Sequence, residues 1–180
     1  DVRLFQSRSS TGVRGVRLLG DDKVISMSIL RRAGTTSEER EAYLRSPKWR
    51  DNAAAEGLTE ERYAEIADKE QFLLTVTVNG FGKRSSITEY TRHGRGTKGM
   101  IAIRQTDHKG KVVAATLVRP DDEIMLITDK GVLVRTRVSE IRELGRTTQG
   151  VTLIALDAGS TLSGLQRIVE NDVNASDSHT

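Results

Sequence analysis

Two stretches of sequence decide the fold: Phe72-Leu-Leu-Thr-Val-Thr-Val-Asn-Gly80 and, 51 residues later, Glu123-Ile-Met-Leu-Ile-Thr-Asp-Lys-Gly131. Each is an apolar run that ends in residues tolerant of positive φ, as a hairpin turn requires. The similarity continues without a gap when residues 80–103 are set against residues 131–154. Such self-similarity at a fixed period indicates a repeated structural unit.

Each repeat is predicted to form four short strands, because Val, Ile and Leu occur in runs of strand length between turn signals. An earlier, partial repeat contains Gly12-Val-Arg-Gly15 and one further strand. Its front half is missing, so we expect the chain to be a piece of a longer protein. Four strands in about 50 residues are typical of propeller blades, and we predict a mainly β, propeller-like fold of about 2.5 blades. The strands are expected at 24–29 in the first repeat, at 72–78, 82–88, 99–104 and 111–118 in the second, and at 123–128, 131–138, 150–156 and 161–169 in the third.

The segment between the first and second repeats is predicted to be helical. Thr36 or Ser37 can cap one helix, and Thr59 can open another. A polar, slightly acidic tail follows the last repeat and is expected to be disordered. The predicted organisation is a partial first blade (1–30), a helical insertion (31–71), a second blade (72–119), a third blade (120–169) and a tail (170–180).

The formal net charge of +3 is unevenly distributed. Lys and Arg outnumber Asp and Glu by 20 to 12 in residues 1–30 and 72–169 taken together. They are outnumbered by 8 to 10 in residues 31–71, and the tail has three acidic residues and no basic one. The basic charge therefore belongs to the strand-rich part, which indicates a surface that binds a polyanion.

Basic residues recur in the loops between the second and third strands of each repeat. Arg and Lys can contact successive phosphates, and neighbouring Gly and Thr allow backbone amides and hydroxyls to join. The alternative for any one of them is a turn residue that keeps strand edges soluble. The predicted DNA-binding residues are Arg8, Arg14, Arg17, Lys83, Arg84, Arg92, Arg95, Lys98, Arg135, Arg137, Arg142 and Arg146.

No catalytic, metal or membrane site is expected from the sequence. The chain has no cysteine, and its three histidines, His93, His108 and His179, lack spaced partners of the kind that bind zinc. Its glycine-rich runs precede strands rather than a helix, so they lack the context of a nucleotide phosphate loop. No apolar stretch is long enough to cross a membrane.

Several of these segments resemble the C-terminal domain of the A subunit of DNA gyrase. The resemblance covers nearly all of residues 1–30 and 72–170 and lies outside the insertion. It is carried by Thr11-Gly-Val-Arg-Gly-Val-Arg17, Asn79-Gly-Phe-Gly-Lys-Arg84, Arg95-Gly-Thr-Lys-Gly99, Ile124-Met-Leu-Ile-Thr-Asp129, Leu133-Val-Arg-Thr-Arg-Val-Ser-Glu-Ile141, Gly145-Arg-Thr-Thr-Gln-Gly150 and Gly164-Leu-Gln-Arg-Ile-Val169.

The resemblance implies a β-pinwheel, in which neighbouring blades exchange strands and double-stranded DNA wraps around a positively charged rim. It implies partners in the remainder of the gyrase A polypeptide and in the gyrase B polypeptide of an A2B2 holoenzyme, in the bacterial cytoplasm. The cleavage tyrosine and the ATP and Mg²⁺ used for negative supercoiling would lie outside this chain, which itself needs no cofactor.

Two alternatives remain open on the sequence alone. The family's Gln-Arg-Arg-Gly-Gly-x-Gly box is absent, and the corresponding domain of topoisomerase IV shares the fold and lacks that box. A propeller-type protein-interaction platform would also use a basic rim, although it would need exposed aromatic anchors that this sequence has few of.

Overall fold

The computed structural model describes residues 3–31, 34–45 and 57–168, so the tail predicted at 170–180 lies outside the described residues. Helices α1 (Ser37–Arg45) and α2 (Glu60–Asp68) come first. The strands follow as β1 (Phe72–Thr77), β2 (Phe81–Ser86), β3 (Val112–Val118), β4 (Glu123–Thr128), β5 (Leu133–Arg137), β6 (Val151–Thr152) and β7 (Leu162–Ile168). Single 3-10 turns, η1 (Ile87–Glu89) and η2 (Val138–Glu140), follow β2 and β5.

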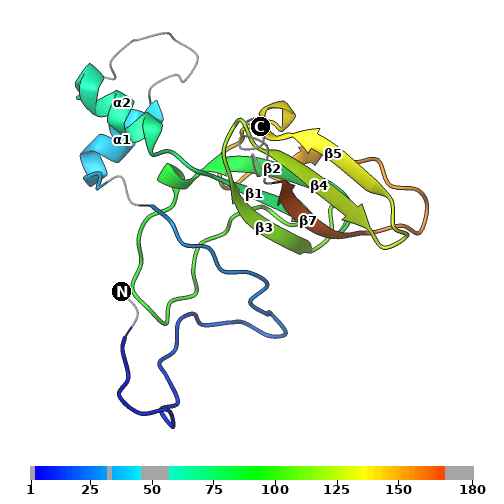
Figure 1. The fold of residues 1–180 in the computed structure, drawn as a ribbon, viewed down its shortest axis with the longest axis horizontal. Helices are drawn as coiled ribbons and strands as arrows, with labels where there is room; N and C mark the ends of the chain where they lie inside the picture. The colour runs from blue at the N-terminus through cyan, green and yellow to red at the C-terminus, as the bar shows by residue number, and fades with distance from the viewer. Residues whose placement is uncertain (1–2, 32–33, 46–56, 169–180) are drawn as a thin grey trace, which may run out of the picture.

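The strands form two antiparallel sheets, one in the order β3-β1-β2-β6 and the other in the order β5-β4-β7 (Figure 1). The prediction of a mainly β fold built from repeats is confirmed, because β1 and β2 of one repeat correspond to β4 and β5 of the next. Both hairpins pair as expected, with Leu74 opposite Arg84 in the first and Met125 opposite Arg135 in the second. Gly80 has a φ of +81° in the first turn, a value that glycine adopts without strain.

One apolar core joins the two sheets. Leu74 and Val76 from β1 and Ile124 and Leu126 from β4 are completely buried, and Leu162 of β7 packs with them. In β4 the buried side chains alternate with partly exposed ones, as a sheet with one covered face requires, whereas Thr75 and Thr77 of β1 are buried as well. Because neither sheet could bury this face alone, the two repeats stabilise each other.

Strands are exchanged between repeats. β6 belongs to the third repeat, yet it pairs with β2 of the second, with Phe81 opposite Thr152 and Gly82 opposite Val151. The strand exchange implied by the family resemblance is therefore present. The β-sheet of the third repeat has three described strands, and β5 forms its edge.

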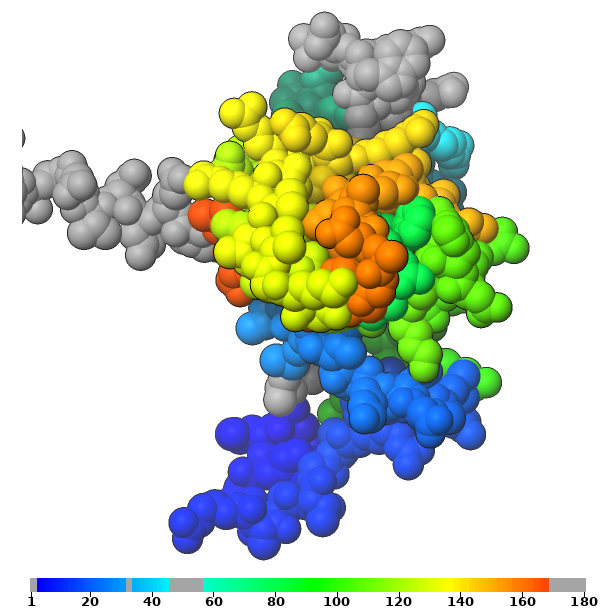
Figure 2. Space-filling view, turned by 90° about the vertical axis from the view of Figure 1, so that its right-hand side faces the viewer, coloured from blue at the N-terminus to red at the C-terminus, as the bar shows by residue number. Residues whose placement is uncertain are grey.

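Three strand predictions were wrong in extent or in kind. Residues 24–29 and 99–104 form no regular strand, and the strand expected at 150–156 is reduced to β6. Since β6 pairs with the preceding repeat, residues 99–104 would need an equivalent of β2 before them, and no described segment supplies it. Residues 3–31 instead extend from the sheets as an exposed segment, visible at one end of the molecule in Figure 2.

The helical insertion forms as predicted around a small core of its own. Thr59 caps α2 by accepting a hydrogen bond from the backbone N of Arg62 at 3.2 Å. Tyr43 and Ile66 are buried between the two helices, and the Tyr43 ring lies 5.0 Å from that of Tyr63. The insertion thus folds as a helical hairpin beside the sheets (Figure 1).

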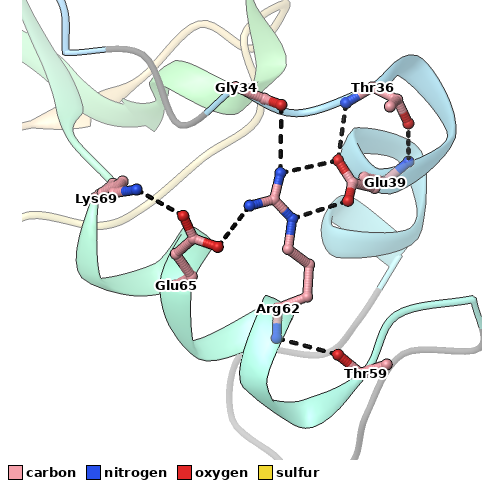
Figure 3. Close-up of polar contacts among 7 residues, drawn as sticks. All are labelled: Gly34, Thr36, Glu39, Thr59, Arg62, Glu65 and Lys69. Atoms are coloured by element: carbon pink, nitrogen blue, oxygen red, sulfur yellow. Dashed lines mark hydrogen bonds and ion pairs between the residues drawn. The ribbon is translucent and has the colours of Figure 1, made fainter.

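Arg62 joins the two helices through its guanidinium, as Figure 3 shows. Its Nε lies 2.8 Å from Glu39 on α1, and its Nη1 lies 2.6 Å from Glu65 on α2. Lys69 pairs with the same Glu65 at 2.7 Å. The hydrogen bonds from Arg62 and from the backbone of Thr36 lower the pKa of Glu39 to about 2.

Glu70 attaches the insertion to the first sheet. One carboxylate oxygen accepts a hydrogen bond from the Tyr43 hydroxyl at 2.6 Å, and the other accepts one from the Ser86 hydroxyl at 2.5 Å. Burial and the neighbouring Glu70 raise the pKa of Tyr43 above its usual range. The tyrosine therefore stays neutral and acts as a donor, so α1 is held at the end of β2.

We expect Arg62→Ala to destabilise the chain at neutral pH and to lose this effect in acid. The folded-state pKa of Glu39 is depressed from 4.5, so the stabilisation that it provides is present above pH 4.5 and is lost as the pH falls towards 2. The free energy of unfolding of Arg62→Ala should thus approach that of the parent chain over this interval, as followed by urea titration. Arg45→Ala is the control, because Arg45 pairs with Glu41 on an exposed surface where ion pairs contribute little. A pH-independent difference for Arg62→Ala would contradict the assignment.

Candidate nucleic-acid interface

Two glycine-rich loops, residues 94–99 and 145–150, have the same local structure. In each, a threonine hydroxyl donates to the carbonyl oxygen of the first glycine, at 3.4 Å in the first loop and 2.8 Å in the second. Each loop ends in a glycine in the left-handed region, with φ of +77° at Gly99 and +78° at Gly150. The sequence repeat is therefore also a repeat of backbone conformation.

The first of these loops pairs with its counterpart from the partial repeat, and we call residues 12–17 and 94–99 together the paired loops. Gly96 N donates to the Gly15 carbonyl at 2.9 Å, and Arg17 N donates to the Thr97 carbonyl at 2.8 Å. This pairing brings together two segments that carry four exposed cations: Arg14, Arg17, Arg95 and Lys98.

The second loop is anchored to the preceding repeat. The backbone N of Arg146 donates to Glu89 Oε2 at 2.6 Å, and Arg146 Nη1 donates to the Ile101 carbonyl at 2.7 Å. Arg104 N also donates to the Thr148 carbonyl at 2.9 Å. Residues 101–104 follow shortly after loop 94–99 in the chain, and loop 94–99 is itself bonded to residues 12–17. The basic loops of the three repeats are therefore linked in one series by hydrogen bonds.

The structure places the predicted DNA-binding residues in three environments. Arg84 and Arg146 are half-buried, and Lys83 is completely buried. The Arg84 guanidinium lies 5.2 Å from the centre of the Phe72 ring, and its Nε and Nη1 are buried with no hydrogen-bond partner among the described residues. The exposed ones are Arg8, Arg14, Arg17, Arg92, Arg95, Lys98, Arg135, Arg137 and Arg142.

Lys83 requires a correction, because its ammonium group faces the protein rather than solvent. Its Nζ donates to the carbonyls of Gly145 and Arg146, each at 2.6 Å, and to the Thr148 hydroxyl at 3.1 Å. Burial lowers the pKa of Lys83 to about 8, and the negative charge of Glu89 acts in the opposite direction. A direct contact between Lys83 and a DNA phosphate does not fit this arrangement.

Two residues that hold the second loop, Glu89 and Lys109, were not predicted from the sequence. Lys109 Nζ donates to the Gly150 carbonyl at 3.0 Å and lies 4.7 Å from the centre of the Phe81 ring. Glu89 could have been recognised from the repeat, since Glu140 occupies the equivalent position 51 residues later. For Lys109 we find no such signal, because the two groups that its side chain contacts, the Gly150 carbonyl and the Phe81 ring, lie in segments distant from it in the sequence.

Other kinds of site have little support in the described part of the chain. No group of three or more His, Cys, Asp or Glu side chains there is arranged to hold a metal ion. Neither described helix is long and apolar enough to cross a membrane. The chemistry offered by the connected loops is the binding of anions through guanidinium, ammonium and backbone N–H groups.

A family model for the DNA gyrase C-terminal domain, described as a beta-propeller, matches residues 1–31, 71–119 and 122–168. This chain belongs to the DNA gyrase C-terminal domain family. The matched ranges leave out most of the helical insertion, although the blade boundaries that we assigned stay a prediction.

Named relatives agree with this assignment. The DNA gyrase A polypeptide of Rickettsia bellii is 44% identical over 190 residues, covering 98% of this chain and 21% of that protein. Its counterpart in Granulibacter bethesdensis is 40% identical over 194 residues, covering 95% of this chain and 21% of that protein. The chain thus spans about a fifth of the length of these relatives.

Solved structures show the same fold. The structure of a DNA gyrase A C-terminal domain superimposes with a TM-score of 0.52 at 29% identity, over 54% of this chain and 33% of that one. The C-terminal domain of DNA topoisomerase IV gives a TM-score of 0.51 at 18% identity, over 54% and 31% of the two chains, and is alike in fold alone. The named relatives therefore favour gyrase over the topoisomerase IV alternative.

Within this gyrase-family domain, the two hairpins differ at several charged positions, and Glu123 is one of them. Glu123 pairs with Arg135, and Arg137 Nε lies 3.8 Å from its other oxygen. The equivalent of Glu123 in the preceding repeat is Phe72, whose ring contacts Arg84 instead. One carboxylate thus partly neutralises two of the exposed arginines in the third repeat.

Proposed function

We propose that this chain is the DNA-binding and DNA-wrapping module of a DNA gyrase A polypeptide. The observation that carries the proposal is the paired loops, two hydrogen-bonded segments that carry the exposed residues Arg14, Arg17, Arg95 and Lys98. None of the ion pairs formed by the described residues involves these four side chains. Their charge is therefore free to attract a polyanion.

The proposed mechanism is electrostatic. Lys and Arg neutralise successive phosphates and release the counterions that DNA holds, while loop amides and hydroxyls add hydrogen bonds. Because the loops of successive repeats are connected, a duplex that follows them is bent, and no contact to base edges is needed. Binding should depend steeply on salt and weakly on sequence.

The remaining functions belong to the whole protein. We propose that the cleavage tyrosine and the ATP and Mg²⁺ sites lie outside this chain, which has no catalytic role of its own. Its partners would be double-stranded DNA, the remainder of the gyrase A polypeptide and the gyrase B polypeptide in the bacterial cytoplasm. Wrapping would present a DNA segment for ATP-dependent strand passage and so support negative supercoiling.

The test measures binding to duplexes of increasing length at several salt concentrations, followed by a topology assay with a nicking-closing enzyme. Length-dependent binding, a steep salt slope and trapped writhe are expected. Binding without trapped writhe would indicate that DNA is bound or bent without strong wrapping, which is the behaviour that we expect if the domain is of the topoisomerase IV type. Failure to bind at low salt would overturn the DNA proposal and favour a protein-interaction platform.

A gain of affinity is expected for Glu123→Gln. The change releases Arg135 and Arg137 from their shared carboxylate, so both guanidinium groups can pair with phosphates. The slope of log K against log salt should become steeper by about 1 to 2. Fluorescence anisotropy of a labelled duplex measures this slope.

Asp121→Asn is the matched control for Glu123→Gln. It removes the same negative charge two residues before Glu123, but Asp121 is exposed and forms none of the ion pairs among the described residues. A small change in affinity is expected, since exposed charges are screened by salt. Equal gains from the two substitutions would show that only the net charge matters.

A further inference from the structure

The contacts of Lys83 suggest a role beyond packing. Its three donated hydrogen bonds all end on the loop of residues 145–150, which belongs to the next repeat, whereas Lys83 itself lies on β2. A lysine ammonium has three N–H donors, and here each has an acceptor. One buried side chain thus fixes three points of a neighbouring loop.

These hydrogen bonds determine the orientation of the peptide groups in the loop. The Arg146 carbonyl is drawn towards Lys83, and a trans peptide is planar with its N–H opposite its carbonyl. The N–H of Thr147 therefore points away from Lys83, and Thr147 is exposed. The Arg146 N–H is taken by Glu89, so Thr147 provides the outward-facing donor of this turn.

Comparison of the repeats indicates that this lysine-held arrangement is specific to one junction between repeats. The residue equivalent to Lys83 in the next repeat is Val134, which has no donor to offer. The equivalent loop, residues 94–99, is instead held by two backbone hydrogen bonds, from Gly96 N to the Gly15 carbonyl and from Arg17 N to the Thr97 carbonyl. Only loop 145–150, among the described residues, is set by a lysine from the repeat before it.

We propose that Lys83 is a positioning residue for DNA binding: without touching DNA, it holds loop 145–150 of the next repeat so that the Thr147 N–H faces a phosphate. This inference rests on the proposed function and extends it from exposed cations to a buried one. The ammonium also places a positive charge directly beneath the loop, which favours an anion on the outer side.

Single-cysteine reporters can test this role, because the chain contains no cysteine of its own. One reporter is Thr147→Cys in the lysine-held loop, and the other is Lys98→Cys in the paired loops. Each carries a photo-crosslinker and is compared with and without Lys83→Met in the intact chain, on a labelled duplex. Lys130→Met is the control, since Lys130 also donates to a loop carbonyl, that of Ala158 at 3.3 Å, away from this junction.

We expect Lys83→Met to reduce crosslinking from position 147 and to leave crosslinking from position 98 unchanged. The salt slope should fall by about 0.9, the share of one phosphate contact, and Lys130→Met should change neither readout. Hydrogen exchange without DNA should quicken in residues 145–148 and not in residues 94–97. Equal losses at both reporters would show a general structural role and overturn the proposal, as would unchanged crosslinking at position 147.

The same experiment separates this proposal from the proposed function. If neither reporter crosslinks in the parent chain at low salt, the domain does not bind DNA and the positioning role of Lys83 falls with it. If position 98 crosslinks and position 147 does not, DNA binding stands and the role of Lys83 is overturned.

Discussion

Replacing Arg14, Arg17, Arg95 and Lys98 together with alanine should weaken DNA binding by roughly 10²–10³ at 0.1 M salt, with equal losses on unrelated sequences. Backbone hydrogen bonds hold the two segments that carry these side chains next to each other, and each neutralised phosphate contributes about 0.9 to the slope of log K against log salt. The slope should therefore fall by about 3 to 4. Anisotropy titrations at several salt concentrations measure both quantities.

A matched control distinguishes an effect of the paired loops from an effect of net charge alone. Arg95→Ala with Lys98→Ala removes two positive charges from the paired loops, and Arg45→Ala with Lys69→Ala removes two from the helical insertion. The first pair should flatten the salt slope by about 2, and the second should leave it nearly unchanged. Equal effects would mean that DNA does not follow the paired loops.

Gly150→Ala is expected to destabilise the chain by about 2–5 kcal/mol, which is a large share of a domain's stability. Gly150 has a φ of +78°, and a Cβ there would lie 2.8 Å from the Gly82 carbonyl oxygen. That oxygen belongs to the backbone of β2, so it cannot move without disturbing the exchanged strand pair. The substitution combines backbone strain with a steric clash at the junction between repeats.

Gly159→Ala provides the comparison, because Gly159 has nearly the same backbone conformation, with a φ of +73°, and no atom within 4 Å of an added Cβ. It should cost about 1 kcal/mol, the strain of a left-handed alanine alone. Urea denaturation followed by circular dichroism gives both free energies of unfolding. Similar costs at the two positions would show that the close approach of Gly150 to β2 is relaxed at little expense.

The repeat made much of this architecture predictable. Apolar runs ending at Gly80 and Gly131 located the two hairpins, and Thr59 located the start of α2. Local patterns of this kind depend on residues close together in the chain. The sequence therefore predicted the elements well, together with the exposed cations of the paired loops.

What could not be predicted depends on contacts between distant segments. Residues 99–104 match the pattern of a strand, but a strand also needs a partner edge, and the pattern carries no information about that partner. Lys83 looked like another rim cation because its burial follows from a loop more than 60 residues away. Likewise, the pairing of Glu123 with Arg135 became evident only when β4 and β5 were placed side by side.

The pairing of β6 with β2 has a consequence for how such a chain can change in length during evolution. Loss of the third repeat would leave the second without β6, its fourth strand, and would expose the edge of β2, which invites aggregation. Additional sequence is tolerated where no exchanged strand crosses, and the helical insertion occupies such a place, immediately before β1. The domain can therefore acquire new segments at the seams between repeats more easily than it can shed the repeats themselves.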